Sequence, residues 1–190
     1  MKMLKDAILN QGKAINEHVL LVDSFLNHQV DVALMDAIGA EFAAFFKDKK
    51  VDRVLTIERS GIAPAAFTAK YLNVPLVIMK KQTSKIMTGD LLQTEVRSFT
   101  KGTEYQLTVK RMFLPKGDNV LFIDDFLASG EAAFGAISLI KKAEASICGI
   151  GIVIEKSFQD GRKRLDELGI PVCSLARIKH MSSNTIEFLE

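Results

Sequence analysis

The sequence predicts an α/β protein with a doubly wound, mostly parallel β-sheet flanked by helices. Short β-branched and apolar runs recur along the chain, each run is followed by a turn of small residues, and a stretch with helical apolar spacing comes next. Strands that alternate with helices build right-handed βαβ units, which form parallel sheets. The chain has 190 residues, of which 48% are hydrophobic and 25% charged. One domain over residues 1–190 can therefore bury a full core.

The first fifty residues are expected to hold two helices with an ambiguous segment between them. Apolar residues recur at helical spacing over 3–8, and the polar stretch 10–12 ends that pattern. Residues 18–25 are apolar around Asp23 and fit either a short strand or an irregular segment. Asp31 is a suitable N-cap for a helix that runs to about Phe46. One face of that helix carries Leu34, Ile38, Phe42 and Phe45.

After residue 50 the pattern changes to alternating strands and helices. We predict strands over 53–57, 74–79, 120–123, 147–154 and 171–178, and helices over 64–71, 132–145 and 161–168. The segment 81–116 does not fit this alternation. It is polar and rich in Thr, Ser and Lys, and only 105–109 alternates like a strand. A long insertion of this kind is typically a lid, a binding loop or an antiparallel flap.

Charge and composition argue against several function classes. The formal net charge of +2 is too small to favour nucleic-acid binding. The first eleven residues mix charges with apolar residues, unlike a signal peptide, and no apolar run is long enough to span a membrane. Cys148 and Cys173 fit small buried hydrophobes, and the three histidines form no ligand cluster. We expect a cytoplasmic protein with no metal site of its own and no nucleic-acid or membrane partner.

The most informative stretch is 120–133, VLFIDDFLASGEAA. Four apolar residues predict a buried strand, and Asp124 and Asp125 follow at its expected carboxyl end. Side chains alternate along a strand, so the two acids cannot both point into the core. Charges at this edge cost solvation free energy unless a ligand there needs acceptors. Vicinal ribose hydroxyls are such a ligand, because each donates a hydrogen bond that a carboxylate can accept.

The turn after these acids predicts a phosphate site. Its residues are Ala128, Ser129, Gly130, Glu131 and Ala132, and a helix follows directly. Small residues let backbone N–H groups approach an anion closely, and the helix N-terminus adds partial positive charge. An acidic pair for a sugar beside a turn for a phosphate describes a ribose 5-phosphate site.

This stretch resembles the motif with which type I phosphoribosyltransferases bind 5-phosphoribosyl 1-diphosphate (PRPP). The chain as a whole resembles the xanthine phosphoribosyltransferase family nearly end to end. Supporting segments are VDSFLNH at 22–28, IERSGIAP at 57–64, SFTK at 98–101 and GIGIVIEKSF at 149–158. The resemblance implies the type I phosphoribosyltransferase fold, with a small hood over residues 1–30 and a flexible flap over 81–116.

The resemblance also implies an activity and a set of site residues. The activity is transfer of the phosphoribosyl group from PRPP to N9 of xanthine in purine salvage. Asp124 and Asp125 would hold the ribose hydroxyls, and residues 128–132 the 5-phosphate. Residues Glu58, Arg59, Ser60 and Gly61 would form the diphosphate loop, and Leu20, Asn27 and Lys156 would contact the purine. Lys156 would meet the 6-oxo group, because an ammonium suits a carbonyl acceptor and opposes an amine. Mg²⁺ would arrive mainly bound to PRPP, and the family is usually homodimeric.

Three residues depart from the family's pattern. Ala128 stands where many relatives that use 6-oxopurines carry an acid near the purine N7, so a general base from this turn is not expected. Glu131 puts a negative charge into the phosphate turn, and we expect its side chain to point outward. Arg59 is larger and more charged than expected for the diphosphate loop, where it either assists the leaving group or is exposed.

Other functions remain open at this point. A guanine/hypoxanthine phosphoribosyltransferase cannot be separated from a xanthine enzyme by physical argument, whereas Lys156 argues against an adenine-specific enzyme. A PRPP-sensing transcriptional regulator would need a DNA-binding domain, and the first fifty residues offer no basic recognition helix. A signalling receiver domain would carry its acidic pair early in the chain, and here the pair comes late and precedes a glycine turn.

Overall fold

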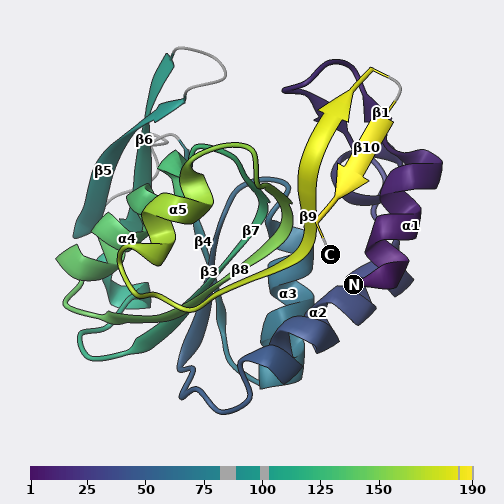
Figure 1. Cartoon of the computed structure of the whole chain (residues 1–190). Coiled ribbons are helices and arrows are strands. Elements are labelled where there is room, and N and C mark those ends of the chain that lie inside the picture. Colours follow the sequence, from purple (N-terminus) through teal and green to yellow (C-terminus); the bar gives the residue numbers. More distant parts are fainter. Residues whose placement is uncertain (82–88, 99–102, 184, 190) are drawn as a thin grey trace.

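A central six-stranded sheet organises the protein (Figure 1). The computed structural model describes residues 1–81, 89–98, 103–183 and 185–189. The strand order is β10-β9-β8-β7-β3-β4. The neighbouring strands from β9 to β4 are parallel, and only β10 runs antiparallel to its neighbour. The strands are β3 (Arg53–Ile57), β4 (Leu76–Met79), β7 (Asn119–Leu127), β8 (Ser146–Lys156), β9 (Val172–Ser182) and β10 (Thr185–Phe188). The predicted α/β class with a mostly parallel sheet is confirmed.

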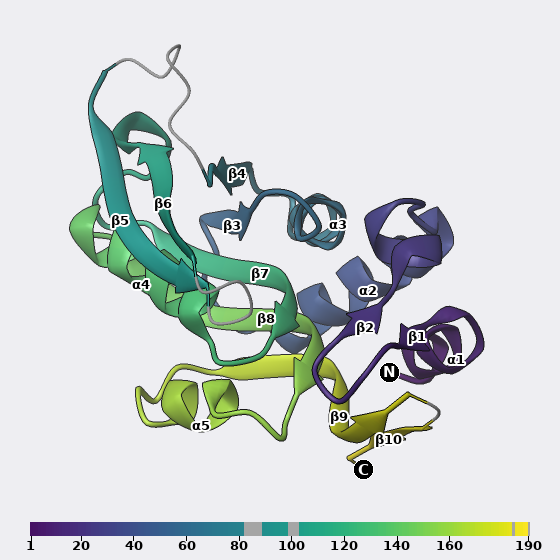
Figure 2. The ribbon, with the colours of Figure 1, turned by 90° about the horizontal axis from the view of Figure 1, so that it is seen from above.

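Helices cover both faces of this sheet, as Figures 1 and 2 show. One face carries α1 (Lys2–Gln11), α2 (Val32–Phe45) and α3 (Ile62–Leu72), and the other carries α4 (Glu131–Lys142) and α5 (Gly161–Asp166). Alternate β7 residues serve the two sides: Leu121 and Ile123 pack in the cluster under α2 and α3, and Phe122 packs in the cluster under α4. None of the helices in the described residues is long and apolar enough to span a membrane.

Helix α2 begins as the sequence predicts and differs at its end. The Asp31 carboxylate accepts a hydrogen bond from the Leu34 N–H at 3.0 Å, which caps the first turn. The predicted apolar face is wrong at one position, because Phe45 is 55% exposed whereas Phe46 is fully buried. The buried arc of α2 also includes Met35 and Gly39. Phe45 therefore lies outside the buried face of α2, whereas Phe46, directly after the helix, points into the core.

Two strands, β7 and β9, continue four residues beyond their predicted ends. Strand β7 was expected to end at Ile123, but it continues to Leu127 and pairs with β8 as far as Glu155. The prediction failed because it relied on one apolar run, whereas hydrogen bonds to β8 carry the strand past the acids to Phe126 and Leu127. Strand β9 likewise extends to Ser182 and forms a hairpin with β10, which the sequence analysis did not predict.

The insertion contains an antiparallel hairpin, β5 (Leu91–Ser98) with β6 (Thr103–Lys110), followed by the 3₁₀ turn η2 (Arg111–Phe113). The sequence predicted a strand only at 105–109. The hairpin packs on α4 so closely that a Cβ on Gly135 would lie 2.5 Å from Val96 Cγ2. Val96 and Leu107 are buried, so this part of the insertion belongs to the core. Residues 82–88 and 99–102 of the predicted flap lie outside the described residues.

The segment predicted as a hood contains α1, the short strands β1 (Lys13–Ala14) and β2 (Leu20–Leu21), and the π-helical turn η1 (Asp23–Asn27). Both alternatives for 18–25 are therefore realised in part. The segment is tied to the end of the sheet, because the Met1 amino group donates to Leu175 O at 2.7 Å and Lys5 Nζ to Leu189 O at 3.2 Å.

Candidate active site

The carboxyl ends of β3, β7 and β8 bring the predicted residues to one edge of the sheet (Figure 2). Ligands bind at this edge in open parallel sheets. The turn at 58–61 follows β3, the acids and the turn at 128–130 belong to β7 and its end, and Lys156 ends β8. The diphosphate loop thus follows β3, and the acids and the phosphate turn belong to the neighbouring strand β7 and its end.

Asp124 is a buried residue, with 6% of its surface exposed. Its Oδ1 accepts a hydrogen bond from the Asp125 N–H at 3.0 Å. Burial raises the pKa of Asp124 well above its ordinary value, and the neighbouring Asp125 raises it further. The sequence predicted that the two acids would not both point into the core. Asp124 is buried and Asp125 only partly buried, because β7 continues through both positions.

The turn after β3 lies directly against Asp124. A Cβ on Gly61 would lie 2.4 Å from Thr56 Oγ1 and 3.1 Å from Asp124 Oδ1, so only glycine fits there. The Thr56 hydroxyl is buried and has no hydrogen-bond partner within the described part of the chain. The peptide bond between Glu58 and Arg59 is cis. The close approach of Gly61 shows that the predicted diphosphate loop reaches Asp124 of β7.

The two charged residues of this loop differ in their environment: Glu58 contacts the start of the insertion, and Arg59 is exposed to solvent. Glu58 accepts a hydrogen bond from the Lys81 N–H at 2.8 Å and pairs with Lys80 Nζ at 3.1 Å. Burial acts to raise the pKa of Glu58, but these contacts hold it below its ordinary value. Glu58 therefore ties the loop to the start of the insertion. Arg59 is exposed, which is one of the two positions considered for it.

The turn at 128–132 lines a cavity of about 130 Å³, together with Arg97 and Tyr105 of the β5–β6 hairpin. Gly130 has a φ of 90° at the N-cap of α4, which favours glycine. Glu131 was expected to point outward, but it forms an ion pair with Arg164 of α5, with Oε1 and Nη1 2.6 Å apart. The charge in the turn is therefore neutralised within the protein.

Lys156 lies at the end of β8, the strand that pairs with β7. Its Nζ donates to His18 O at 2.5 Å and sits 5.2 Å from the centre of the Phe126 ring. Burial lowers the pKa of Lys156, and the nearby Asp125 acts in the opposite direction. Leu20 is buried in the cluster against which Phe126 packs. Asn27 is exposed on η1, so its predicted contact with a purine stays a prediction.

Sequence reasoning missed Arg97, Tyr105 and Arg164. Tyr105 lines the cavity beside the turn at 128–132. Burial raises the pKa of Tyr105, and Asp124 and Glu131 raise it further. The alternation over 105–109 marked Tyr105 as a strand residue, but no local signal joined it to β7. Among the described residues, no group of three or more His, Cys, Asp or Glu side chains could hold a metal ion.

Comparisons with known proteins identify the family of this chain. Residues 28–172 match the phosphoribosyl transferase domain. The chain is 56% identical over 190 residues to xanthine phosphoribosyltransferase 1 of Clostridium botulinum, with both chains fully covered. It is 54% identical to the xanthine phosphoribosyltransferase of Agathobacter rectalis, covering 100% of this chain and 99% of the relative.

Solved structures share the fold at low sequence identity. The adenine phosphoribosyltransferase of Giardia lamblia in complex with 9-deazaadenine superposes with a TM-score of 0.77 at 23% identity, covering 93% of this chain and 98% of that one. The Trypanosoma brucei enzyme in complex with AMP, pyrophosphate and ribose-5-phosphate has a TM-score of 0.77 at 18% identity, covering 92% and 79%. With three quarters of its length matched and full-length relatives above half identity, the chain belongs to the phosphoribosyltransferase family.

Proposed function

We propose that the protein transfers the 5-phosphoribosyl group of PRPP to N9 of xanthine in purine salvage, forming xanthosine 5′-monophosphate and diphosphate. The observation that carries the proposal is the meeting of Asp124 and Asp125 with the loops at 58–61 and 128–132 at one sheet edge. Full-length identity with xanthine phosphoribosyltransferases of other bacteria supports xanthine as the base.

In this proposal the ribose, the 5-phosphate and the diphosphate of PRPP occupy three adjacent parts of the site. Asp124 and Asp125 accept hydrogen bonds from the ribose hydroxyls. The N–H groups of 129–132 and the N-terminus of α4 bind the 5-phosphate. The loop of Glu58, Arg59, Ser60 and Gly61 receives the diphosphate, with exposed Arg59 available to its charge. The cavity beside 128–132 supports this placement.

The base binds on the Lys156 side, over Phe126 and beside the hood residues Leu20 and Asn27. The Lys156 ammonium gives up its hydrogen bond to His18 O and donates to the 6-oxo oxygen instead. The bond from C1 of the ribose to diphosphate breaks, N9 bonds to C1, and the displaced N–H proton passes to solvent. Ala128 offers no carboxylate near N7, so the turn itself supplies no base.

The family's Mg²⁺ fits the residues of this edge. Asp124 and Asp125 are adjacent, and among the described residues no ion pair with Asp124 is present. Two such carboxylates favour a divalent ion, and Mg²⁺ is commonly held by one or two carboxylates together with substrate phosphates. Asp124 and Asp125 would be its protein partners. The Thr56 hydroxyl, which has no hydrogen-bond partner among the residues that the structure describes, also lies beside Gly61. Bound with PRPP, the ion would neutralise negative charge on the leaving diphosphate.

A direct assay tests this function. The protein is incubated with PRPP, Mg²⁺ and one of xanthine, guanine, hypoxanthine or adenine, and nucleotide and diphosphate are quantified. We expect the highest kcat/KM with xanthine and no turnover with adenine. Diphosphate release with none of the bases would remove the enzyme assignment. A preference for guanine or hypoxanthine would instead make it a guanine/hypoxanthine phosphoribosyltransferase.

We further propose that the protein is a cytoplasmic homodimer. Both cysteines are free thiols, as suits a reducing compartment. The open edge of the sheet at β4 borders an apolar groove of about 580 Å³ lined by Leu76, Ile78 and Phe113, among others. Phe113 is 48% exposed, and covering such a surface favours association. Light scattering after size-exclusion chromatography should give twice the monomer mass, and a monomer mass would contradict the proposal.

A further inference from the structure

The carbonyl groups of the phosphate turn are held by α5, a helix that the sequence did not connect with the site. Ala128 O accepts a hydrogen bond from the Gly161 N–H at 3.0 Å. Ser129 O accepts one from Arg164 Nη1 at 2.7 Å. Two successive carbonyls of the turn therefore point toward α5.

This orientation decides where the N–H groups of the turn point. In a trans peptide the C=O and N–H point in opposite directions. With Ala128 O and Ser129 O directed at α5, the N–H groups of Ser129 and Gly130 face away from it. The cavity beside the turn is lined by Arg97, Tyr105 and residues 126–133, and α5 contributes nothing to its lining among the described residues. The donors thus face the side on which the cavity lies.

Arg164 also neutralises the negative charge of Glu131. The same Nη1 that binds Ser129 O lies 2.6 Å from Glu131 Oε1, and the guanidinium sits 4.3 Å from the centre of the Phe134 ring on α4. An unpaired carboxylate in the first turn of α4 would repel a phosphate bound at that helix N-terminus. The Arg164 guanidinium therefore neutralises Glu131 and also holds the backbone of the turn at Ser129.

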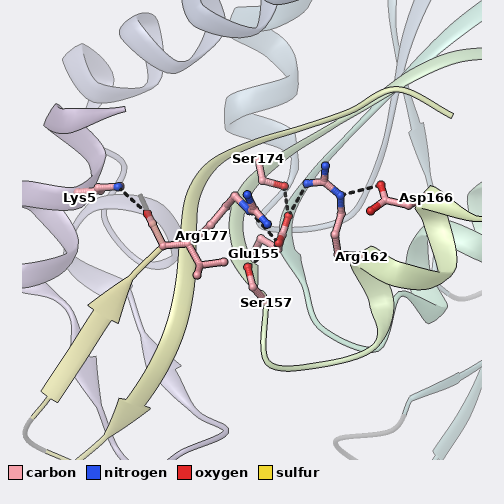
Figure 3. Close-up of polar contacts among 8 residues, drawn as sticks. Lys5, Glu155, Ser157, Arg162, Asp166, Ser174 and Arg177 are labelled. Carbon is pink, nitrogen blue, oxygen red and sulfur yellow. Dashed lines mark hydrogen bonds and ion pairs between the residues drawn. The ribbon is translucent and has the colours of Figure 1, made fainter. Parts of the chain in front are cut away.

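The position of α5 is itself set by a buried carboxylate (Figure 3). Glu155 of β8 is fully buried. It binds Arg162 of α5, with Nη1 and Oε2 3.0 Å apart, and it also accepts hydrogen bonds from Ser157, Ser174 and Arg177. Arg162 in turn pairs with Asp166 on the same helix. The network fixes α5 to the sheet end next to Lys156.

We infer that Arg164 and Gly161 of α5 are positioning residues for the 5-phosphate site. They bind the carbonyls of Ala128 and Ser129, so that the N–H groups of Ser129 and Gly130 face away from α5, and Arg164 neutralises Glu131. The inference rests on the proposed function for the identity of the phosphate. It adds two residues that touch no substrate, and it links the phosphate side of the site to the base side through Glu155.

The test compares Arg164→Met with Lys163→Met. Lys163 is exposed on the same helix, so both variants lose one positive charge and only Arg164→Met loses the contacts. We expect Arg164→Met to raise the KM for PRPP and the inhibition constant of ribose 5-phosphate by about 10-fold or more, the scale of a lost charged hydrogen bond. The KM for xanthine and inhibition by diphosphate should change by less than about threefold, since those groups bind elsewhere.

Equal effects of the two variants on PRPP and ribose 5-phosphate would overturn the inference. Calorimetric binding of ribose 5-phosphate needs no turnover. The two proposals can therefore fail separately. Equal binding of ribose 5-phosphate by the two variants rejects the positioning role, whereas a wild type that releases no diphosphate rejects the proposed function. Arg164→Lys keeps the charge and a donor, and it should recover part of the affinity.

Gly161→Ala supplies a second test if Arg164→Met does not fold. A Cβ at position 161 would lie 2.3 Å from Ala128 O and 2.9 Å from Gly130 N, so the turn must move. Gly169→Ala is the matched control, because Gly169 has a φ of 67° and open space around it. Both variants should lose stability, but only Gly161→Ala should weaken ribose 5-phosphate binding. Wild-type affinity in folded Gly161→Ala would contradict the inference.

Discussion

Asp124 and Glu155 lie on the neighbouring strands β7 and β8, and both side chains are withdrawn from water, with exposures of 6% and 0%. Their surroundings differ. Glu155 binds two arginines and two serine hydroxyls, and although burial acts to raise its pKa, these partners hold the pKa below its ordinary value. Asp124 has a backbone N–H and a second acid beside it, and its pKa is raised.

This difference distinguishes a carboxylate that stabilises the fold from one that is suited to bind a ligand. A buried charge that the protein compensates joins parts of the fold, as Glu155 joins β8, β9 and α5. A buried carboxyl that the protein leaves uncompensated costs stability, and perturbed groups of this kind cluster at functional sites. Substitution should raise the stability of the protein at Asp124 and lower it at Glu155, and such opposite effects would establish the distinction.

The largest effect is expected at Asp124. Asp124→Asn keeps the shape and removes the charge that would meet the ribose and its metal, so kcat/KM should fall by about 10²–10³ or more. Stability should change the other way. The folded-state pKa of Asp124 is raised above 3.8, so ionisation costs more in the folded state and wild-type stability falls as pH rises through the folded-state pKa.

Asp124→Asn should therefore melt at a higher temperature than the wild type at neutral pH, and this advantage should disappear at pH values below 3.8. Thermal unfolding at a series of pH values measures it, with the exposed Asp48→Asn as a control that shifts neither activity nor melting. A variant less stable than wild type at pH 7 would show that the Asp124 charge supports the fold.

The next largest effect is a loss of stability in Glu155→Gln. Breaking a buried ion pair by removing one partner costs about 3–5 kcal/mol, and we expect about 3 kcal/mol because Arg162 and Arg177 keep access to water. The pKa of Glu155 is depressed below 4.5 in the folded state. Its contribution is therefore present above pH 4.5 and lost as pH falls through the folded-state pKa.

Denaturant unfolding at pH 7 and at acid pH measures this change. Asp166→Asn is the control, since it breaks only the exposed pair with Arg162 and should cost at most about 0.5 kcal/mol. Equal stability of Glu155→Gln and the wild type at pH 7 would place Glu155 in the same class as Asp124.

A smaller effect is expected at Lys156, the residue that follows Glu155. Lys156→Gln should raise the KM for xanthine by about 10-fold, because one charged hydrogen bond to the 6-oxo group is replaced by a neutral one. The KM for PRPP should stay within about twofold, as in the exposed control Lys179→Gln. Unchanged kinetics with xanthine would remove Lys156 from the base site.

The smallest effect is expected at the two cysteines, where burial is the largest influence on the pKa. Burial raises the pKa of Cys148 and of Cys173 to about 11, so both thiols are neutral at pH 7. Iodoacetamide at neutral pH should leave both unmodified in the native protein and label both in urea. Mass spectrometry detects the adducts, and rapid native labelling of either cysteine would show a thiolate that the fold stabilises.

Features set by neighbours a few residues apart could be predicted from the sequence. The Asp31 cap, the strand at 53–57 and the turn at 128–132 each depend on local spacing, because capping, pleating and tight turns are satisfied within a few residues. The run of acids and small residues at 124–132 identified the candidate site on the same basis. Its resemblance to known phosphoribosyltransferases supplied the substrate.

Contacts between distant segments were decided by the tertiary structure alone. The length of β7 depends on pairing with β8, and that pairing put Asp124 into the core. Arg164 reaches Ser129 across 35 positions, and Glu155 gathers partners from α5 and β9. Such contacts arise only once sheet register and helix packing are set, because no local spacing rule relates the residues involved. The chemistry of this site could therefore be read from the sequence, and the support that orients it could not.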